Sequence, residues 1–176
     1  YFVLKLILES ILSSCAMLTQ FYFDWDSSVT GVYLAGLGLL MLPANLVISH
    51  LAGRFQDREL IIGLLLFMVV GCLGMIHYRP QVPYSMIQYL AASVLLFVST
   101  SALEGPNMSL LSKTIPSSWS RGIFNVGLLA TEAGTLGRAV GDVVLSVFGG
   151  YGLQYLLNLT FGCFAVLCGT TLGLSV

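Results

Sequence analysis

Apolar runs follow one another along the whole chain, and short polar breaks separate them. A helix that spans a membrane needs about 20 mostly apolar residues. Helices satisfy their own backbone hydrogen bonds in lipid, whereas strands with open edges do not. The pattern therefore predicts an all-α, polytopic membrane protein with six transmembrane helices, at about 1–22, 31–52, 60–77, 85–111, 122–149 and 153–176.

The composition agrees with this pattern and excludes several classes of protein. Hydrophobic residues make up 57% of the 176 positions and charged residues 9%, whereas a soluble domain carries about 25% charged residues. The net charge of −1 offers no basic surface to nucleic acid. The sequence shows neither a metal-ligand spacing nor a nucleophile–base pair. We therefore expect membrane lipid as the surroundings, and no enzyme activity, metal, cofactor or nucleic acid.

The polar breaks are too short to form a second domain, but they differ in charge. The second and fourth breaks hold four basic residues, namely Arg54, Arg58, Lys113 and Arg121. Of the other three breaks, only one holds a basic residue, Arg79, and the first is acidic, with Asp24 and Asp26. Because basic loops stay on the cytosolic side, we expect both chain ends and the two basic breaks to face the cytosol.

The span at 122–149 has one polar face. On a helical wheel its polar side chains fall within about 140° of arc, and they are Arg121, Asn125, Thr131, Glu132, Thr135, Arg138 and Asp142. Small residues lie beside this arc, among them Gly134, Gly137 and Gly141. Such a small face lets another helix approach closely. We expect the polar face to line a water-filled cavity.

Two charged residues of this face allow more than one interpretation. Arg138 and Asp142 are spaced i, i+4 and can pair directly, which would make them a structural ion pair. Alternatively, the guanidinium of Arg138 meets an anionic substrate, to which its planar fork is suited. Glu132 has no cation four residues away. It must pair with another helix, face water, or stay protonated as a candidate proton carrier.

Two further spans carry ionisable residues, which are costly in a membrane. Lys5 and Glu9 are spaced i, i+4 in the first span. We expect Lys5 to extend its amine to the cytosolic end of the helix, and Glu9 to face the cavity. In the fourth span Pro106 should break the helix, because it lacks a backbone donor and clashes with the preceding turn. Glu104 next to it is either a gate residue or a cap for the freed backbone, and Asn107 shares its face.

Three segments resemble a known family. Gly53–Arg58 reads GRFQDR and is similar to the GxxxDR signature of the major facilitator superfamily, which lies between the second and third helices of each half. The stretch 104–113, EGPNMSLLSK, resembles the EGVNLSLLSR of the SPX-MFS family. The stretch 120–135, SRGIFNVGLLATEAGT, resembles its SRGTYNGGLLSTEAGT. The chain departs from these motifs at Pro106 and Val126, which affects local helix geometry.

The resemblance implies that the chain is the carboxy-terminal six-helix half of a facilitator transporter. It also implies that the complete transporter moves inorganic phosphate across the vacuolar membrane by alternating access. The amino-terminal half and the SPX domain would be absent from this chain, and that half would be its partner. We expect the cavity to be lined by Glu9, Glu104, Asn107, Asn125, Thr131, Glu132, Thr135, Arg138 and Asp142. We expect a cytosolic loop clamp, which stabilises one access state, at Gly53, Arg54, Asp57 and Arg58.

Two alternative functions stay open at this point. One is a proton-coupled transporter of another organic or inorganic anion, because a single arginine binds phosphate, sulfate and carboxylate alike. The other is a membrane receptor or scaffold that kept the fold without transporting anything.

Overall fold

The computed structural model describes residues 1–79, 81–115 and 126–175. Within these residues the chain forms seven α-helices and no strand. The helices are α1 (Phe2–Phe23), α2 (Ser27–Ala52), α3 (Asp57–Met75), α4 (Met86–Ala102), α5 (Glu104–Thr114), α6 (Val126–Gly149) and α7 (Leu153–Ser175). The prediction of an all-α membrane protein is thus confirmed at the level of secondary structure.

Five segments are long and apolar enough to cross a membrane, namely α1, α2, α3, α4 together with α5, and α7. Helix α6 occupies the position of the predicted fifth span but is not among the five. Its Glu132, Arg138 and Asp142 lie within eleven residues of one another, so every window of spanning length contains all three charges. By length and composition, the structure supports five of the six predicted spans.

Local caps fix the helix ends a few residues away from the predicted ones. Helix α2 begins at Ser27 because the Asp26 side chain accepts a hydrogen bond from the Ser27 N–H at 2.7 Å. Helix α3 begins at Asp57, behind a capping box in which the Gln56 N–H donates to Glu59. Helix α1 ends at Phe23, and Asp24 follows in the left-handed conformation with a φ of 52°. Polar caps, which the hydropathy pattern does not register, therefore extend these helices.

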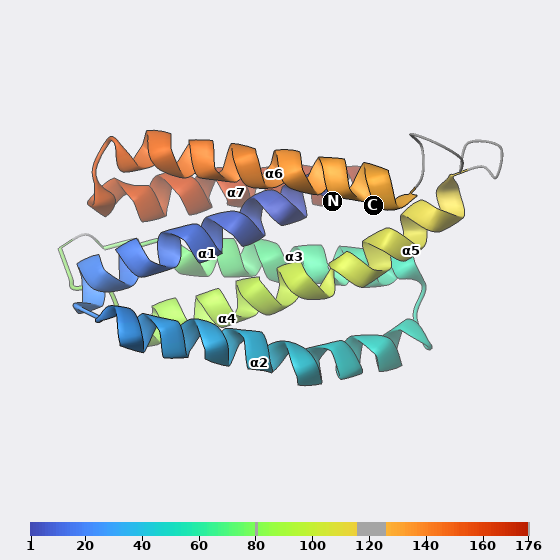
Figure 1. Cartoon of the computed structure of the whole chain (residues 1–176), viewed down its shortest axis with the longest axis horizontal. Coiled ribbons are helices and arrows are strands. Elements are labelled where there is room, and N and C mark those ends of the chain that lie inside the picture. Colours follow the sequence, from blue (N-terminus) through green and yellow to red (C-terminus); the bar gives the residue numbers. More distant parts are fainter. Residues whose placement is uncertain (80, 116–125, 176) are drawn as a thin grey trace.

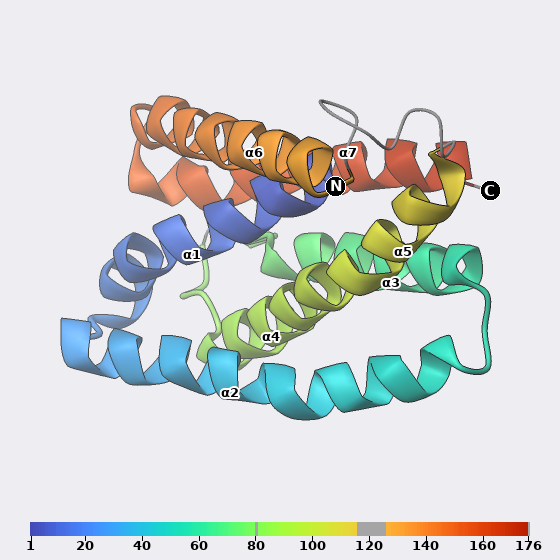
Figure 2. The same ribbon diagram turned by 45° about the vertical axis from the view of Figure 1, so that its right-hand side comes forward.

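The predicted break in the fourth span is present. Helix α4 ends at Ala102 and α5 begins at Glu104, so that α5 continues α4 as a bent rod (Figure 2). Pro106 has no N–H with which to reach the carbonyl of Ala102, and the helix is interrupted at Leu103, between these two residues.

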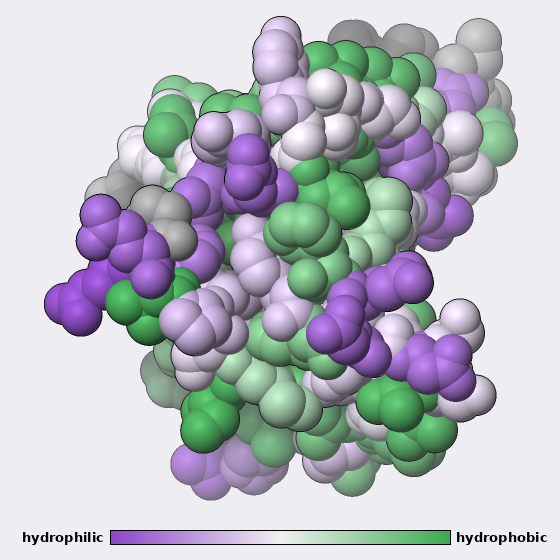
Figure 3. All heavy atoms as spheres, turned by 90° about the vertical axis from the view of Figure 1, so that its left-hand side faces the viewer, coloured by the Kyte–Doolittle hydropathy of each residue, from purple (hydrophilic) through white to green (hydrophobic). Residues whose placement is uncertain are grey.

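The helices pack in layers. Figure 1 shows α6 and α7 along one side of the bundle, α2 along the opposite side, and α1, α3 and α4 between them. Helix α1 packs mainly on α6, and α3 packs on α4 and α7. Leu4, Ile7, Met68, Leu96 and Phe161 are among the fully buried core side chains. Hydrophilic residues gather on the end of the bundle with the turns around residues 25 and 151, between apolar ones (Figure 3).

Candidate functional site

The glycine face of α6 lies against α1. A Cβ added to Gly137 would be 2.6 Å from the Phe2 carbonyl oxygen, and one added to Gly141 would be 2.9 Å from the Leu6 carbonyl oxygen. At Gly134 the nearest atom would belong to the Tyr1 ring, at 3.3 Å. The two backbones therefore approach so closely that a side chain at Gly137 or Gly141 would collide. This contact confirms the predicted role of the small face and identifies α1 as its partner.

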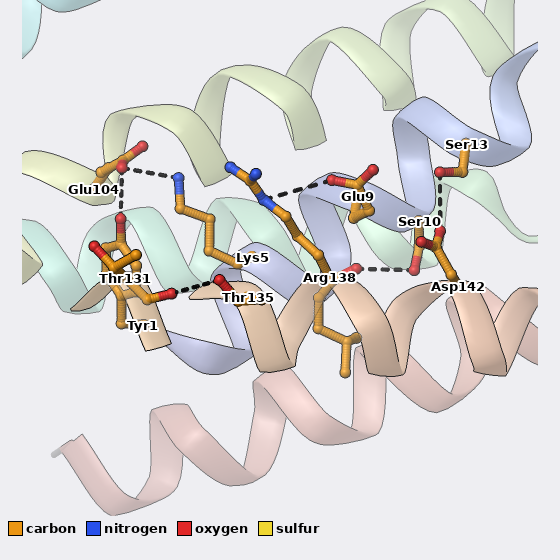
Figure 4. A network of polar contacts seen from close by, with 11 residues as sticks. Tyr1, Lys5, Glu9, Ser10, Ser13, Glu104, Thr131, Thr135, Arg138 and Asp142 are labelled. Atoms are coloured by element: carbon orange, nitrogen blue, oxygen red, sulfur yellow. Dashed lines mark hydrogen bonds and ion pairs between the residues drawn. The ribbon is translucent and has the colours of Figure 1, made fainter. Parts of the chain in front are cut away.

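Because α1 and α6 are so close, their polar side chains meet along one edge of the contact. The Arg138 Nε of α6 lies 3.7 Å from the Glu9 Oε2 of α1. The Ser13 hydroxyl donates to Asp142 at 3.1 Å. Figure 4 shows these residues side by side, with the Arg138 side chain extending between Glu9 and Lys5. Arg138 and Asp142 thus find partners on α1, and the pairing along α6 that their spacing allows does not form.

Lys5 is a clear correction to the sequence interpretation. Its side chain is 9% exposed and its Nζ donates to Glu104 Oε1 at 2.8 Å, so it does not extend to the end of the helix. The same carboxylate oxygen accepts the Tyr1 hydroxyl at 2.6 Å. Glu104 thus joins α1 to the start of α5.

The remaining predicted cavity residues lie nearby but make weaker contacts. Thr131 and Thr135 are exposed and donate to the carbonyl oxygens of Gly127 and Thr131 on their own helix. Glu132 is exposed and has no hydrogen bond or ion pair with any residue that the structure describes. Asn107 lines a cavity of about 170 Å³ together with Tyr1 and Leu103. Asn125 lies outside the described residues.

The predicted loop clamp has an unforeseen partner in α5. Asp57 accepts hydrogen bonds from the Ser109 hydroxyl at 2.8 Å and from the Lys113 amine. Both donors belong to the stretch 104–113 that resembles the family motif. Gly53 ends α2, and Arg54 is exposed beside it. Among the residues assigned to the loop clamp, Asp57 joins two separate elements, the start of α3 and the second half of α5.

Three residues of the polar network were not among the cavity residues predicted from the sequence. They are Tyr1, Ser13 and Lys5, and each lies on the first helix or directly before it. Lys5, Glu9 and Ser13 recur at every fourth position, so they share a face, and this spacing was the available signal. Their partners are about 100 or more residues away along the chain, and periodicity within one helix does not indicate which helix lies opposite.

The network combines two cations with more carboxylates than they neutralise. Lys5 and Arg138 lie among Glu9, Glu104 and Asp142 along the α1, α5 and α6 surface. The Arg138 side chain is 58% exposed, and its two terminal nitrogens make no hydrogen bond with the described residues. A guanidinium held in this way can receive an oxyanion through both terminal amino groups. The described residues contain no group of three or more His, Cys, Asp or Glu side chains placed to hold a metal ion.

Comparison with known proteins identifies close relatives in plants. An SPX domain-containing membrane protein of Arabidopsis thaliana is 41% identical over 96% of this chain. A second one from Oryza sativa subsp. japonica is 39% identical over 98% of the chain. In each case the match covers 24% of the relative, so the chain spans about a quarter of the length of these proteins. No family model matches the chain, and no solved structure gives a significant match.

These identities extend over nearly the whole chain and confirm the resemblance that the motifs suggest. The chain is therefore a relative of the plant SPX domain-containing membrane proteins over about a quarter of their length.

Proposed function

We propose that this chain is one six-helix half of a facilitator-type transporter and that the complete protein moves inorganic phosphate across the vacuolar membrane. In this proposal both chain ends are cytosolic, and an amino-terminal half encloses the polar face from the opposite side. A substrate site near the membrane midplane between two such halves is typical of this architecture. The family motifs and the membrane character of the relatives support the proposal.

The observation that carries the proposal is the state of Arg138. Its Nε lies 3.7 Å from the Glu9 carboxylate, and its terminal nitrogens make no hydrogen bond with the described residues. Guanidinium groups bind phosphate and carboxylate oxygens in a bidentate way, with geometry as well as charge. Lys5, from the neighbouring helix, is neutralised by Glu104, which leaves Arg138 as the cation available to an anion. An exposed arginine in a membrane-spanning helix is costly in lipid unless water or a ligand reaches it.

The carboxylates then adjust the charge of the site. Glu9 and Glu104 each lie against a cation, whereas the exposed Glu132 has no partner among the described residues. A carboxyl group of this kind can take up a proton as the anion binds, so that the net charge carried across the membrane is reduced. We assign to Asp57, with Ser109 and Lys113, the role of stabilising one of the access states on the cytosolic side.

The test is uptake of radiolabelled phosphate by the full-length protein that contains this chain, reconstituted in proteoliposomes. We expect saturable uptake by the wild type and a loss of about 100-fold for Arg138→Ala, because a bidentate pair to a charged group is removed. Arg138→Lys keeps the charge without the fork and should recover only part of the activity. Normal uptake by correctly inserted Arg138→Ala would overturn this assignment.

Competing anions separate the proposal from a transporter of another anion. Excess unlabelled phosphate should block uptake, and an organic acid should not. The receptor or scaffold alternative makes a different prediction, because a cavity would then be unnecessary. Cysteine placed at residues 131, 132 or 135 of the full-length protein should react with a membrane-impermeant maleimide if the polar face lines a cavity. No reaction at any of the three positions would favour the scaffold.

A further inference from the structure

The carboxylates around Arg138 differ in how fully they are hydrogen-bonded. Glu104 accepts two hydrogen bonds, from Tyr1 and from Lys5. Asp142 accepts one from Ser13. Glu9 accepts none from the described residues, although it lies beside Arg138 at 3.7 Å and its side chain is 29% exposed. Of the carboxylates that contact another helix here, Glu9 is thus the one that accepts no hydrogen bond from the described residues.

Glu132 also accepts no hydrogen bond, but it is poorly placed to act with Arg138. It precedes Arg138 by six residues on the same helix, which corresponds to about 9 Å along the axis. Glu9 approaches Arg138 from α1, on the other side of a contact that the α6 glycines keep tight. An anion bound by the terminal nitrogens of Arg138 would therefore have the Glu9 carboxylate close by.

We propose that Glu9 makes the site selective for oxyanions that still carry a proton. This inference rests on the proposed function and deepens it. Inorganic phosphate retains at least one P–OH group at neutral pH, and that hydroxyl can donate to the Glu9 carboxylate. Sulfate carries no proton at this pH, so its oxygens would meet the carboxylate without a hydrogen atom between them. The repulsion and the lost hydrogen bond both act against sulfate.

The environment of Glu9 supports this role. The charged groups that face it or lie near it are Arg138 at 3.7 Å, Asp142 one turn further along α6, and Lys5 one turn back on α1. An ionised carboxylate accepts hydrogen bonds through both of its oxygens. The donor and the acceptor needed to distinguish phosphate from sulfate therefore come from two helices that are locked together by backbone contact.

The test compares arsenate and sulfate as competitors of radiolabelled phosphate uptake by the full-length protein in proteoliposomes. Arsenate keeps a proton as phosphate does, so it should compete with the wild type, whereas sulfate should not. In Glu9→Gln the amide can donate to sulfate, and we expect sulfate to inhibit at concentrations about tenfold lower than in the wild type. Glu9→Asp keeps the carboxylate and should keep the exclusion of sulfate.

The ratio of sulfate to arsenate inhibition separates selectivity from a general effect. Loss of a negative charge alone would strengthen inhibition by both anions equally and leave the ratio unchanged, which would overturn the inference. Equal competition by sulfate and arsenate in the wild type would overturn it as well. Absence of saturable phosphate uptake by the wild type would instead contradict the proposed function. Asp24→Asn, an exposed change at the end of α1, is the matched control for loss of a carboxylate.

Discussion

The two sides of the bundle are held together in different ways. On the α6 side, glycines bring two backbones into contact and polar pairs follow the seam, including Arg138 with Glu9. On the α2 side, only Thr30 and Leu37 of that helix are buried. Two hydrogen bonds fasten its first half, one between the Thr30 and Thr19 hydroxyls and one between the Tyr33 and Ser93 hydroxyls. Its second half borders an apolar groove of about 690 Å³ that α3 and α4 complete.

This difference shows what holds helices together when lipid is the solvent. Apolar side chains gain little by leaving lipid tails for one another, so close packing and hydrogen bonds provide most of the association. Helix α6 has both, because its small residues lie beside its polar ones. Helix α2 is apolar along most of its length and has neither over its second half. Mutations on the two sides should therefore change the stability of the protein by different amounts, and even in opposite directions.

The largest effect is expected from Gly137→Ala. The added Cβ would lie 2.6 Å from the Phe2 carbonyl oxygen and 3.1 Å from the Leu6 nitrogen, both backbone atoms, so α1 and α6 must separate. We expect the free energy of unfolding to fall by about 3 kcal/mol, measured as a lower midpoint of thermal unfolding in detergent. Gly162→Ala is the control, because nothing lies within 4 Å of its added Cβ. Equal midpoints for the two variants would contradict the tight seam.

Lys5→Met should give the next largest effect. It removes the cation from the buried pair and leaves the Glu104 carboxylate with the Tyr1 hydroxyl alone. We expect a loss of about 2 kcal/mol of stability, since a charged group loses a hydrogen bond in a poorly solvated site. The double variant Lys5→Met with Glu104→Gln should recover part of this loss in the same unfolding assay. Additive losses in the double variant would show that the two side chains act independently.

A smaller effect is expected at the contact between α3 and α5. Asp57→Asn keeps an acceptor for Ser109 but loses the ion pair with Lys113, whose side chain is 67% exposed. A pair of this exposure changes a two-state equilibrium by about fivefold at most. Maleimide labelling of a cysteine at residue 131 should change by that factor in the full-length protein. Unchanged labelling and uptake would show that Asp57 takes no part in the loop clamp.

The smallest effect, with the opposite sign, is expected from Gly63→Ala in the apolar groove. This glycine lines the groove, and nothing lies within 4 Å of a Cβ built on it. Alanine favours the helical backbone by about 0.5 to 1 kcal/mol over glycine, so the unfolding midpoint should rise slightly. The same substitution is thus harmful in α6 and mildly stabilising in α3. A marked loss of stability would show that the groove is occupied in the full-length protein.

The sequence predicts the single helices well, because their features are local. Hydropathy locates them, the glycines of α6 indicate a tight seam, and Pro106 indicates the break between α4 and α5. The predicted positions of the helix ends were less accurate, since caps such as Asp26 act through hydrogen bonds that hydropathy does not measure.

The pairing of charges could not be predicted, because it depends on which helices are neighbours. The i, i+4 spacing of Arg138 with Asp142 allowed a pair within α6, and Lys5 was expected to extend to the end of its helix. Instead, the close approach of α1 and α6 brings Glu9 to Arg138, and α5 brings Glu104 to Lys5. The contact between Asp57 and Lys113 is of the same kind, because its partners are 56 positions apart in the sequence.

Helix α5 has a mechanical consequence for the molecule as a whole. It is a rod of eleven residues that is separated from α4 at Leu103 and fastened near both ends. Its first residue, Glu104, is held by Lys5 and Tyr1, and its second half is held by Asp57 through Ser109 and Lys113. While both fastenings are made, the rod cannot turn as a unit about Leu103. Release of the contacts with Asp57 frees the far end of α5 to turn about Leu103, so the charged seam and the Asp57 contact both act on this one helix.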